Sequence, residues 1–171
     1  MNVNYFNTNE KNGIELLTKL NDDVNFLKKH IKMPVKHCVD ASGCTDLLNV
    51  LIEIKIRKEG ICTYDDVYIE SKKAAYLYFD WVVNGNIPIY LNGFKYGKND
   101  EYPYRIAIWR LDKVKRYIYH PKTKTHSDGF EKDEYRERFG LYPKDAAIYE
   151  LGSNGKYKMV KNIGEDWHES I

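Results

Sequence analysis

Three charged residues alternate with isoleucines in the segment Leu-Ile-Glu-Ile-Lys-Ile-Arg, which spans residues 51–57. Strict alternation is typical of a β-strand, in which successive side chains point to opposite faces. The isoleucines then share one face, and Glu53, Lys55 and Arg57 form a polar row on the other, about 6–7 Å apart from one to the next. This polar row can hold a divalent metal ion through its carboxylate and steady a phosphate beside it. Lys55 would orient an attacking water or stabilise the developing charge.

A metal ion needs a further carboxylate, and two aspartates upstream of Glu53 are candidates. Asp46 lies seven residues before Glu53, and Asp40 lies thirteen residues before it. We favour Asp46 as the first ligand and keep Asp40 as its rival. Residues 44–57 form either one long strand or a hairpin folded near Asn49, and only the hairpin brings Asp46 close to Glu53. The sequence leaves this choice open.

A helix is predicted before this segment. Apolar residues recur at spacings of three and four over residues 13–31, which indicates one buried helix face. Asn12 and Glu15 resemble a capping box at its start, and Pro34 stops it. A break at residues 21–23 is compatible with the pattern.

A second helix is predicted over residues 65–83, and the glycine at position 85 ends it. Strands are expected at 35–39, 87–94, 105–111, 113–119 and 146–151, a short helix near 131–139, and turns at 40–43, 58–60 and 152–155. This order of elements predicts an α/β fold with a central mixed β-sheet flanked by helices. A length of 171 residues predicts a single domain over residues 1–171.

The chain resembles the PD-(D/E)xK nuclease superfamily at three places: Asp46, the Glu-Ile-Lys of residues 53–55, and the Val-Tyr-Ile-Glu-Ser-Lys-Lys of residues 67–73. Many members carry a central strand reading Glu-x-Lys-x-Arg, followed by a helix that opens with an acidic residue and lysines. The resemblance implies a restriction-endonuclease-like core at about residues 10–111, with a C-terminal extension over 112–171. Two departures are that no proline precedes Asp46 and that its distance from Glu53 is short.

The resemblance also implies a site. Asp46 and Glu53 are the expected ligands of Mg²⁺ or Mn²⁺, and Lys55 is the expected catalytic lysine. Arg57 and Lys73 are expected to contact phosphate. Glu70 would support the site from the second helix, and Glu15 matches a position at which some members keep another acid, although we favour its role in the capping box.

The net charge of the chain is only +2, so a nucleic acid would have to meet a local basic surface. Such a surface is predicted in the stretch from residue 113 to residue 124, where no acidic residue occurs and tyrosines interleave with the basic residues. Lysines on an edge strand also serve to prevent association between sheets, and this alternative stays open. The basic residues of this predicted patch are Lys113, Lys115, Arg116, Lys122 and Lys124.

Several other classes are not indicated. The three cysteines show no CxxC pair, so free thiols are favoured over disulfides or a zinc site. No glycine-rich phosphate loop or nucleophile elbow occurs. No apolar run has the length of a membrane span and the N-terminus lacks the pattern of a secretory signal, so we expect a cytoplasmic protein. The resemblance implies that a bacterium or a phage encodes it.

The predicted function is therefore hydrolysis of phosphodiester bonds in nucleic acid, with DNA as the expected substrate and Mg²⁺ or Mn²⁺ as cofactor. The alternative is a catalytically inactive nuclease-like domain that binds nucleic acid or a protein partner. A purely structural or assembly role is a third interpretation. A homodimer is compatible with the sequence but is not visibly encoded in it.

Overall fold

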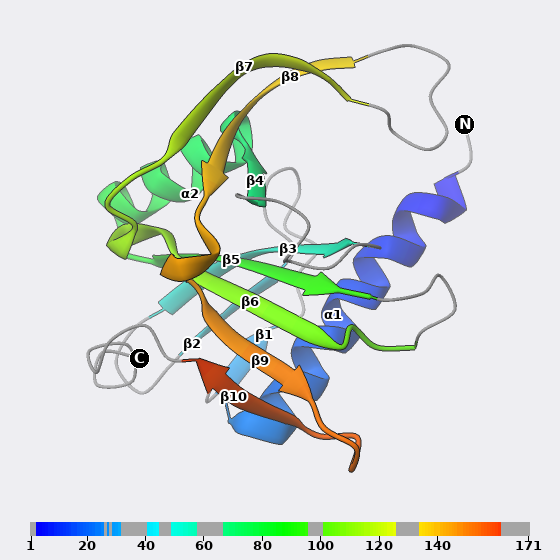
Figure 1. Ribbon diagram of the computed structural model, residues 1–171. Coiled ribbons are helices and arrows are strands. Elements are labelled where there is room, and N and C mark those ends of the chain that lie inside the picture. Colours follow the sequence, from blue (N-terminus) through cyan, green and yellow to red (C-terminus); the bar gives the residue numbers. More distant parts are fainter. Residues whose placement is uncertain are drawn as a thin grey trace.

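A computed structural model describes residues 3–25, 27, 29–31, 41–44, 49–57, 67–95, 101–125 and 134–161. In these residues seven strands form a main sheet in the order β1-β2-β3-β5-β6-β9-β10, and three form a small sheet in the order β4-β8-β7 (Figure 1). The strands are β1 (Lys29–Ile31), β2 (Ala41–Cys44), β3 (Asn49–Arg57), β4 (Val67–Glu70), β5 (Ile87–Phe94), β6 (Arg105–Arg110), β7 (Ile118–Thr125), β8 (Glu134–Leu141), β9 (Ala147–Leu151) and β10 (Tyr157–Lys161).

The main sheet is mixed. β2 and β3 form an antiparallel hairpin, and β3 then runs parallel to β5 through the crossover helix α2 (Ser71–Asn84). All other strand pairs of this sheet are antiparallel. Helix α1 (Val3–Val24) packs on one face and α2 on the other. The predicted α/β fold with a central mixed sheet flanked by helices is confirmed.

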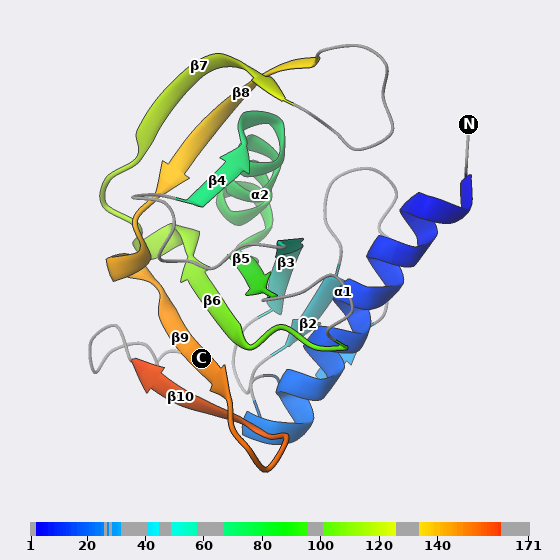
Figure 2. The same cartoon turned by 45° about the vertical axis from the view of Figure 1, so that its right-hand side comes forward.

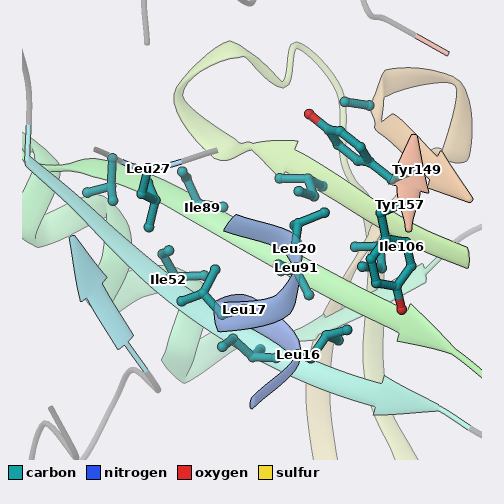
Figure 3. Close-up of a cluster of buried hydrophobic side chains, with 14 of the residues drawn as sticks. Leu16, Leu17, Leu20, Leu27, Ile52, Ile89, Leu91, Ile106, Tyr149 and Tyr157 are labelled. Carbon is teal, nitrogen blue, oxygen red and sulfur yellow. The ribbon is translucent and has the colours of Figure 1, made fainter. Parts of the chain in front are cut away.

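Leucines of α1 form the core on the first face, which we call the α1 face. Leu16, Leu17 and Leu20 are fully buried and lie against Ile52 of β3 and Leu91 of β5, as Figure 3 shows. Each such side chain contributes about 1.5–3 kcal/mol through its removal from water. The isoleucines of the alternating segment therefore do occupy one face, as predicted.

The second face, which we call the α2 face, is covered by α2 and by the small sheet. Ala74 and Leu77 of α2 pack with Tyr90 of β5 and Trp109 of β6. Figure 2 shows β4, β8 and β7 lying over α2. The end of α2 follows its prediction: Gly85 has a positive φ of 74° and donates its backbone N–H to the carbonyl of Trp81, a left-handed C-terminal cap. None of the described helices is long and apolar enough to cross a membrane.

The first predicted helix exists with other bounds. α1 begins ten residues earlier than expected and ends at Val24, next to the break considered at residues 21–23. Asn12 lies inside the helix, so the predicted capping box is wrong. Asn25 has a φ of 51°, which ends the helix, and Lys29–Ile31 is a strand instead of the helix's last turn.

Some of the other predicted elements are confirmed and others are wrong. The strands at 87–94, 105–111 and 146–151 and the turn at 152–155 are confirmed within a residue. The predicted turn at 40–43 is wrong at Ala41–Cys44, which is a strand, and residues 67–70 form β4 instead of the first turn of the second helix. The helix near 131–139 is wrong because Glu134–Leu141 pairs with β7 and β4, and the strand at 113–119 lies later, at Ile118–Thr125. The predicted strand at 35–39 and turn at 58–60 lie outside the described residues.

Candidate active site

The polar row lies on the α2 face of the main sheet. In the parallel register with β5, Glu53 pairs with Tyr90 and Lys55 pairs with Asn92. The row does not simply face water, because only 2% of Glu53 is exposed while Lys55 is an exposed residue. Its acidic end is therefore enclosed by protein, whereas the Lys55 side chain is partly exposed.

Lys73, in the first turn of α2, forms an ion pair with Glu53 through its Nζ and the carboxylate Oε1. The side chain of Lys73 is 35% exposed, so this pair has one buried member and one partly hydrated member. A buried carboxylate is costly unless a cation and hydrogen bonds compensate its loss of water. Lys73 was expected to contact phosphate. In the structure it pairs with Glu53, the carboxylate that was expected to bind the metal ion.

Lys55 lies within electrostatic reach of four charged neighbours. Loss of water around its ammonium group is the main cause that lowers its pKa from the ordinary lysine value, and the positive charges of Lys73 and Arg57 add to the effect. Glu70 and Glu53 act in the opposite direction and raise the pKa. The structure therefore brings together five of the predicted site residues: the polar row, Glu70 and Lys73.

Arg57 joins three strands. Its Nε donates to Oδ1 of Asn92 at 2.8 Å, and its NH2 group donates to the backbone carbonyl of Tyr68 at 2.8 Å and to the hydroxyl of Tyr90 at 3.4 Å. The Tyr90 hydroxyl also donates to the Tyr68 carbonyl at 2.6 Å. This guanidinium ties β3 to β5 and to β4, a positioning role in addition to the phosphate contact expected from the sequence.

Glu70 is the last residue of β4, immediately before α2. Its side chain makes no cap hydrogen bond to the helix and instead forms an ion pair with Arg136 of β8. Sequence reasoning missed Arg136, Tyr68 and Asn92 as members of this region. Asn92 alone carried a visible signal, since it is a polar residue inside the apolar strand Ile-Pro-Ile-Tyr-Leu-Asn.

The structure does not bring Glu15 to the polar row. Glu15 is exposed on α1, and α1 packs on the α1 face, whereas Glu53 and Lys55 lie on the α2 face. Gly13 of α1 is close to Ile54, an α1-face residue of β3. Asp46 and its rival Asp40 both lie outside the described residues.

The predicted basic patch surrounds the start of β7. Lys113 ends a short 3-10 helix (Leu111–Lys113), and Lys115 and Arg116 follow it; all three are exposed. Lys122 and Lys124 belong to β7 itself. The patch is thus built from the small sheet and the segment that leads into it.

The donor chemistry of the described residues is that of a hard divalent cation. Carboxylate oxygens are the ligands that Mg²⁺ prefers, and Glu53 presents a buried carboxylate beside two lysines that suit a phosphate. Within the described part of the chain, no three His, Cys, Asp or Glu side chains gather as a metal site. The donor type fits the ion, and the two aspartates that the sequence offers as further ligands lie outside the described residues.

No family model matches this chain, and no curated protein matches it. Among solved structures, the chain is similar to Hjc, a Holliday junction resolvase from the archaeal hyperthermophile Archaeoglobus fulgidus. The TM-score is 0.44 and the sequence identity 13%, over 76% of this chain and 88% of that chain. A likeness this distant carries neither a family nor an activity to the present chain.

Proposed function

We propose that this protein is a metal-dependent nuclease that hydrolyses phosphodiester bonds of nucleic acid, with DNA as the expected substrate. The observation that carries the proposal is the burial of Glu53 next to Lys55 and Lys73. An ordinary solvated strand face would leave such charges in water. Clusters of buried and coupled ionisable groups occur preferentially at functional sites.

Each residue has a role that follows from its position. Glu53 offers carboxylate oxygens to the ion, and Lys55, at the open end, holds the attacking water or the developing charge. Lys73 can pass from Glu53 to a phosphate oxygen once a metal ion compensates the carboxylate. Arg57 keeps the strands of the site in fixed relative positions. A bound Mg²⁺ would polarise the phosphoryl oxygen and lower the pKa of a water molecule.

The described part of the β2–β3 hairpin favours Asp40 over Asp46 as the second carboxylate. Ala41, the residue directly after Asp40, pairs with Ile52, the residue directly before Glu53. Asp46 belongs instead to the connection between Cys44 and Asn49, which pair with each other. Asn49 is four residues from Glu53 along β3, about 13 Å at the rise of a strand. We therefore reverse the preference drawn from the sequence, which favoured Asp46, and propose Asp40 as the first ligand.

The proposal is tested with supercoiled plasmid, single-stranded DNA and RNA, each in Mg²⁺, Mn²⁺ or EDTA. The wild-type protein should cleave at least one of them only when a divalent ion is present. Lys55→Ala and Glu53→Gln should each lower the rate by about 10²-fold or more. Lys158→Ala is the matched control, because Lys158 is an exposed lysine on β10 at the far edge of the main sheet.

Asp40→Asn and Asp46→Asn extend the test to the second ligand. We expect Asp40→Asn to lower the rate as strongly as Glu53→Gln, and Asp46→Asn to leave most of it. Cleavage that survives both Lys55→Ala and Glu53→Gln would contradict the site assignment.

A second candidate keeps the fold without the reaction: an inactive domain that binds nucleic acid or a protein partner. The ion pair between Lys73 and Glu53 favours it, because a carboxylate oxygen that binds a lysine is not available to a metal ion. Calorimetric titration with Mn²⁺ separates the two. Uptake that disappears in Glu53→Gln supports the nuclease, whereas absent uptake together with nucleic-acid binding supports the inactive domain.

A further inference from the structure

The small sheet has two unlike faces, which follow from its register. Val67 and Ile69 of β4 point to the side that packs on α2, together with Leu141 of β8, which pairs with Val67. Residues one position away along each strand point to the other side. This second side, which we call the outer face of the small sheet, carries Tyr68, Glu70, His120, Arg136 and Arg138.

Three of these side chains form one cluster. The guanidinium carbon of Arg138 lies 5.3 Å from the centre of the Tyr68 ring, and the ring of His120 meets the same tyrosine edge-on at a centroid distance of 4.8 Å. All three residues are partly exposed. An arginine over a tyrosine ring is held in place while its N–H groups and its outer surface stay available.

The cluster is continuous with the polar row. The carbonyl of Tyr68 accepts hydrogen bonds from Arg57 and from the Tyr90 hydroxyl, so the backbone under the cluster is fixed to β3 and β5. Glu70, two residues along β4, pairs with Arg136 and acts electrostatically on Lys55. The cluster is therefore joined to the polar row through Arg57 and the backbone of β4.

We propose that Tyr68, His120 and Arg138 form a stacking platform for an unpaired base of the nucleic acid next to the bond that is cut. This inference rests on the proposed function and deepens it, because it names single-stranded or branched nucleic acid as the preferred substrate. A base stacks readily on an aromatic ring or an arginine plane, and it can do so only when it is not paired within a duplex. Arg136 lies beside the platform, where it would contact the adjoining phosphate. Its ion pair with Glu70 reduces the net positive charge at this place.

This assignment differs from the patch expected from the sequence. One interleaved tyrosine of that patch has another role: Tyr117 donates its hydroxyl to the carbonyl of Leu111 and packs against Phe139, which borders the apolar core of the α2 face. Arg138, the cation of the platform, and Arg136 beside it come from β8, outside the predicted patch.

Fluorescence anisotropy in EDTA measures binding without cleavage. The probes are a labelled single-stranded 20-mer, the duplex of the same sequence, and a four-way junction with unpaired bases at its centre. The wild-type protein should bind the single strand and the junction at least tenfold more tightly than the duplex. Tyr68→Leu and Arg138→Lys should each weaken binding to the single strand by about tenfold, the order expected from the loss of one stacking contact.

Arg138→Lys keeps the charge and removes the planar group, so it separates stacking from simple attraction to phosphate. The thermal unfolding of Arg138→Lys should match that of the wild type. This variant therefore still tests the platform if Tyr68→Leu fails to fold. Lys158→Ala again serves as control, since it removes a distant exposed cation. Wild-type binding that both platform variants leave unchanged, or a preference for the duplex, would overturn the platform alone. Absence of any binding and cleavage by the wild type would overturn the proposed function with it.

Discussion

Both faces of the main sheet bury a charged pair, but the two pairs are built differently. On the α1 face, Arg110 of β6 binds Asp112 two residues away, and their side chains are only 4% and 7% exposed. On the α2 face, Glu53 binds Lys73 from another element, and the lysine is 35% exposed. The first pair is local and closed, which suits a structural role. The second is open on its cationic side and continues into Lys55, which suits a site that exchanges one cation for another.

The rest of each face follows the same division. The α1 face packs leucines of one helix against isoleucines of three strands, so its residues serve the stability of the fold. The α2 face carries a second apolar cluster, yet the polar row and fully buried Asn92 interrupt it. Polar groups inside an apolar cluster cost stability unless they are paired. We infer that the α1 face supports the fold and that the α2 face gives up part of its packing to position chemistry.

The largest expected effect is on the α1 face. Leu17→Ala should lower the free energy of unfolding by about 2–5 kcal/mol, because it leaves a cavity between α1 and the sheet. Urea denaturation followed by circular dichroism measures it. Phe79→Ala is the control: Phe79 is 67% exposed on α2, and its loss should change the stability by about 0.5 kcal/mol or less. Equal effects of the two substitutions would contradict the packing described for α1.

A smaller effect compares the two buried pairs directly. Lys73→Met should destabilise the metal-free protein by about 1–3 kcal/mol, less than for a fully enclosed pair because Lys73 is partly hydrated. Millimolar Mn²⁺ should restore part of this loss, since a bound cation compensates Glu53 and stabilises the folded state by mass action. Thermal unfolding with and without the ion is the measurement.

Asp112→Asn is the matched variant on the α1 face. It should destabilise the protein because Arg110 keeps its buried charge, and Mn²⁺ should not restore the loss. If Mn²⁺ restored the stability of Lys73→Met and Asp112→Asn equally, the metal would act at another place. If it restored the stability of neither, the Glu53–Lys73 pair would not differ from the Arg110–Asp112 pair in its response to a cation.

The features that the sequence predicted well are those set by neighbours along the chain. Alternation in residues 51–57 assigned both faces of β3, and Gly85 marked the end of α2 through its backbone conformation. Elements whose state depends on a distant partner were mistaken. Residues 134–141 carry charges and aromatic residues compatible with a helix, and they form a strand because β7 and β4 pair with them on either side.

The same distinction holds for the candidate site. The polar row could be predicted because its members lie two residues apart on one strand. The ion pairs around the row could not, since Lys73 lies 20 residues from Glu53 and Arg136 lies 66 residues from Glu70. Only the crossover through α2 and the addition of β8 to β4 bring the members of each pair together. The resemblance implied that Lys73 contacts phosphate, but not that it pairs with Glu53.

The smallest expected effect concerns pH and involves one buried tyrosine on each face. Burial raises the pKa of Tyr149, on the α1 face, to about 12. The neutral form of this tyrosine is therefore favoured in the folded state, so its contribution is complete below the ordinary tyrosine pKa of about 10 and is lost as the pH rises from about 10 to 12. The loss at pH 11 should be about 1 kcal/mol, and Tyr149→Phe should remove that part of the alkaline destabilisation.

On the α2 face, burial also raises the pKa of Tyr90, but the positive charge of Arg57 opposes the shift. Tyr90→Phe should likewise remove a part of the alkaline destabilisation, in urea titrations between pH 8 and 11. Alkaline destabilisation that both variants keep in full would contradict the view that burial holds these two hydroxyl groups in their neutral form.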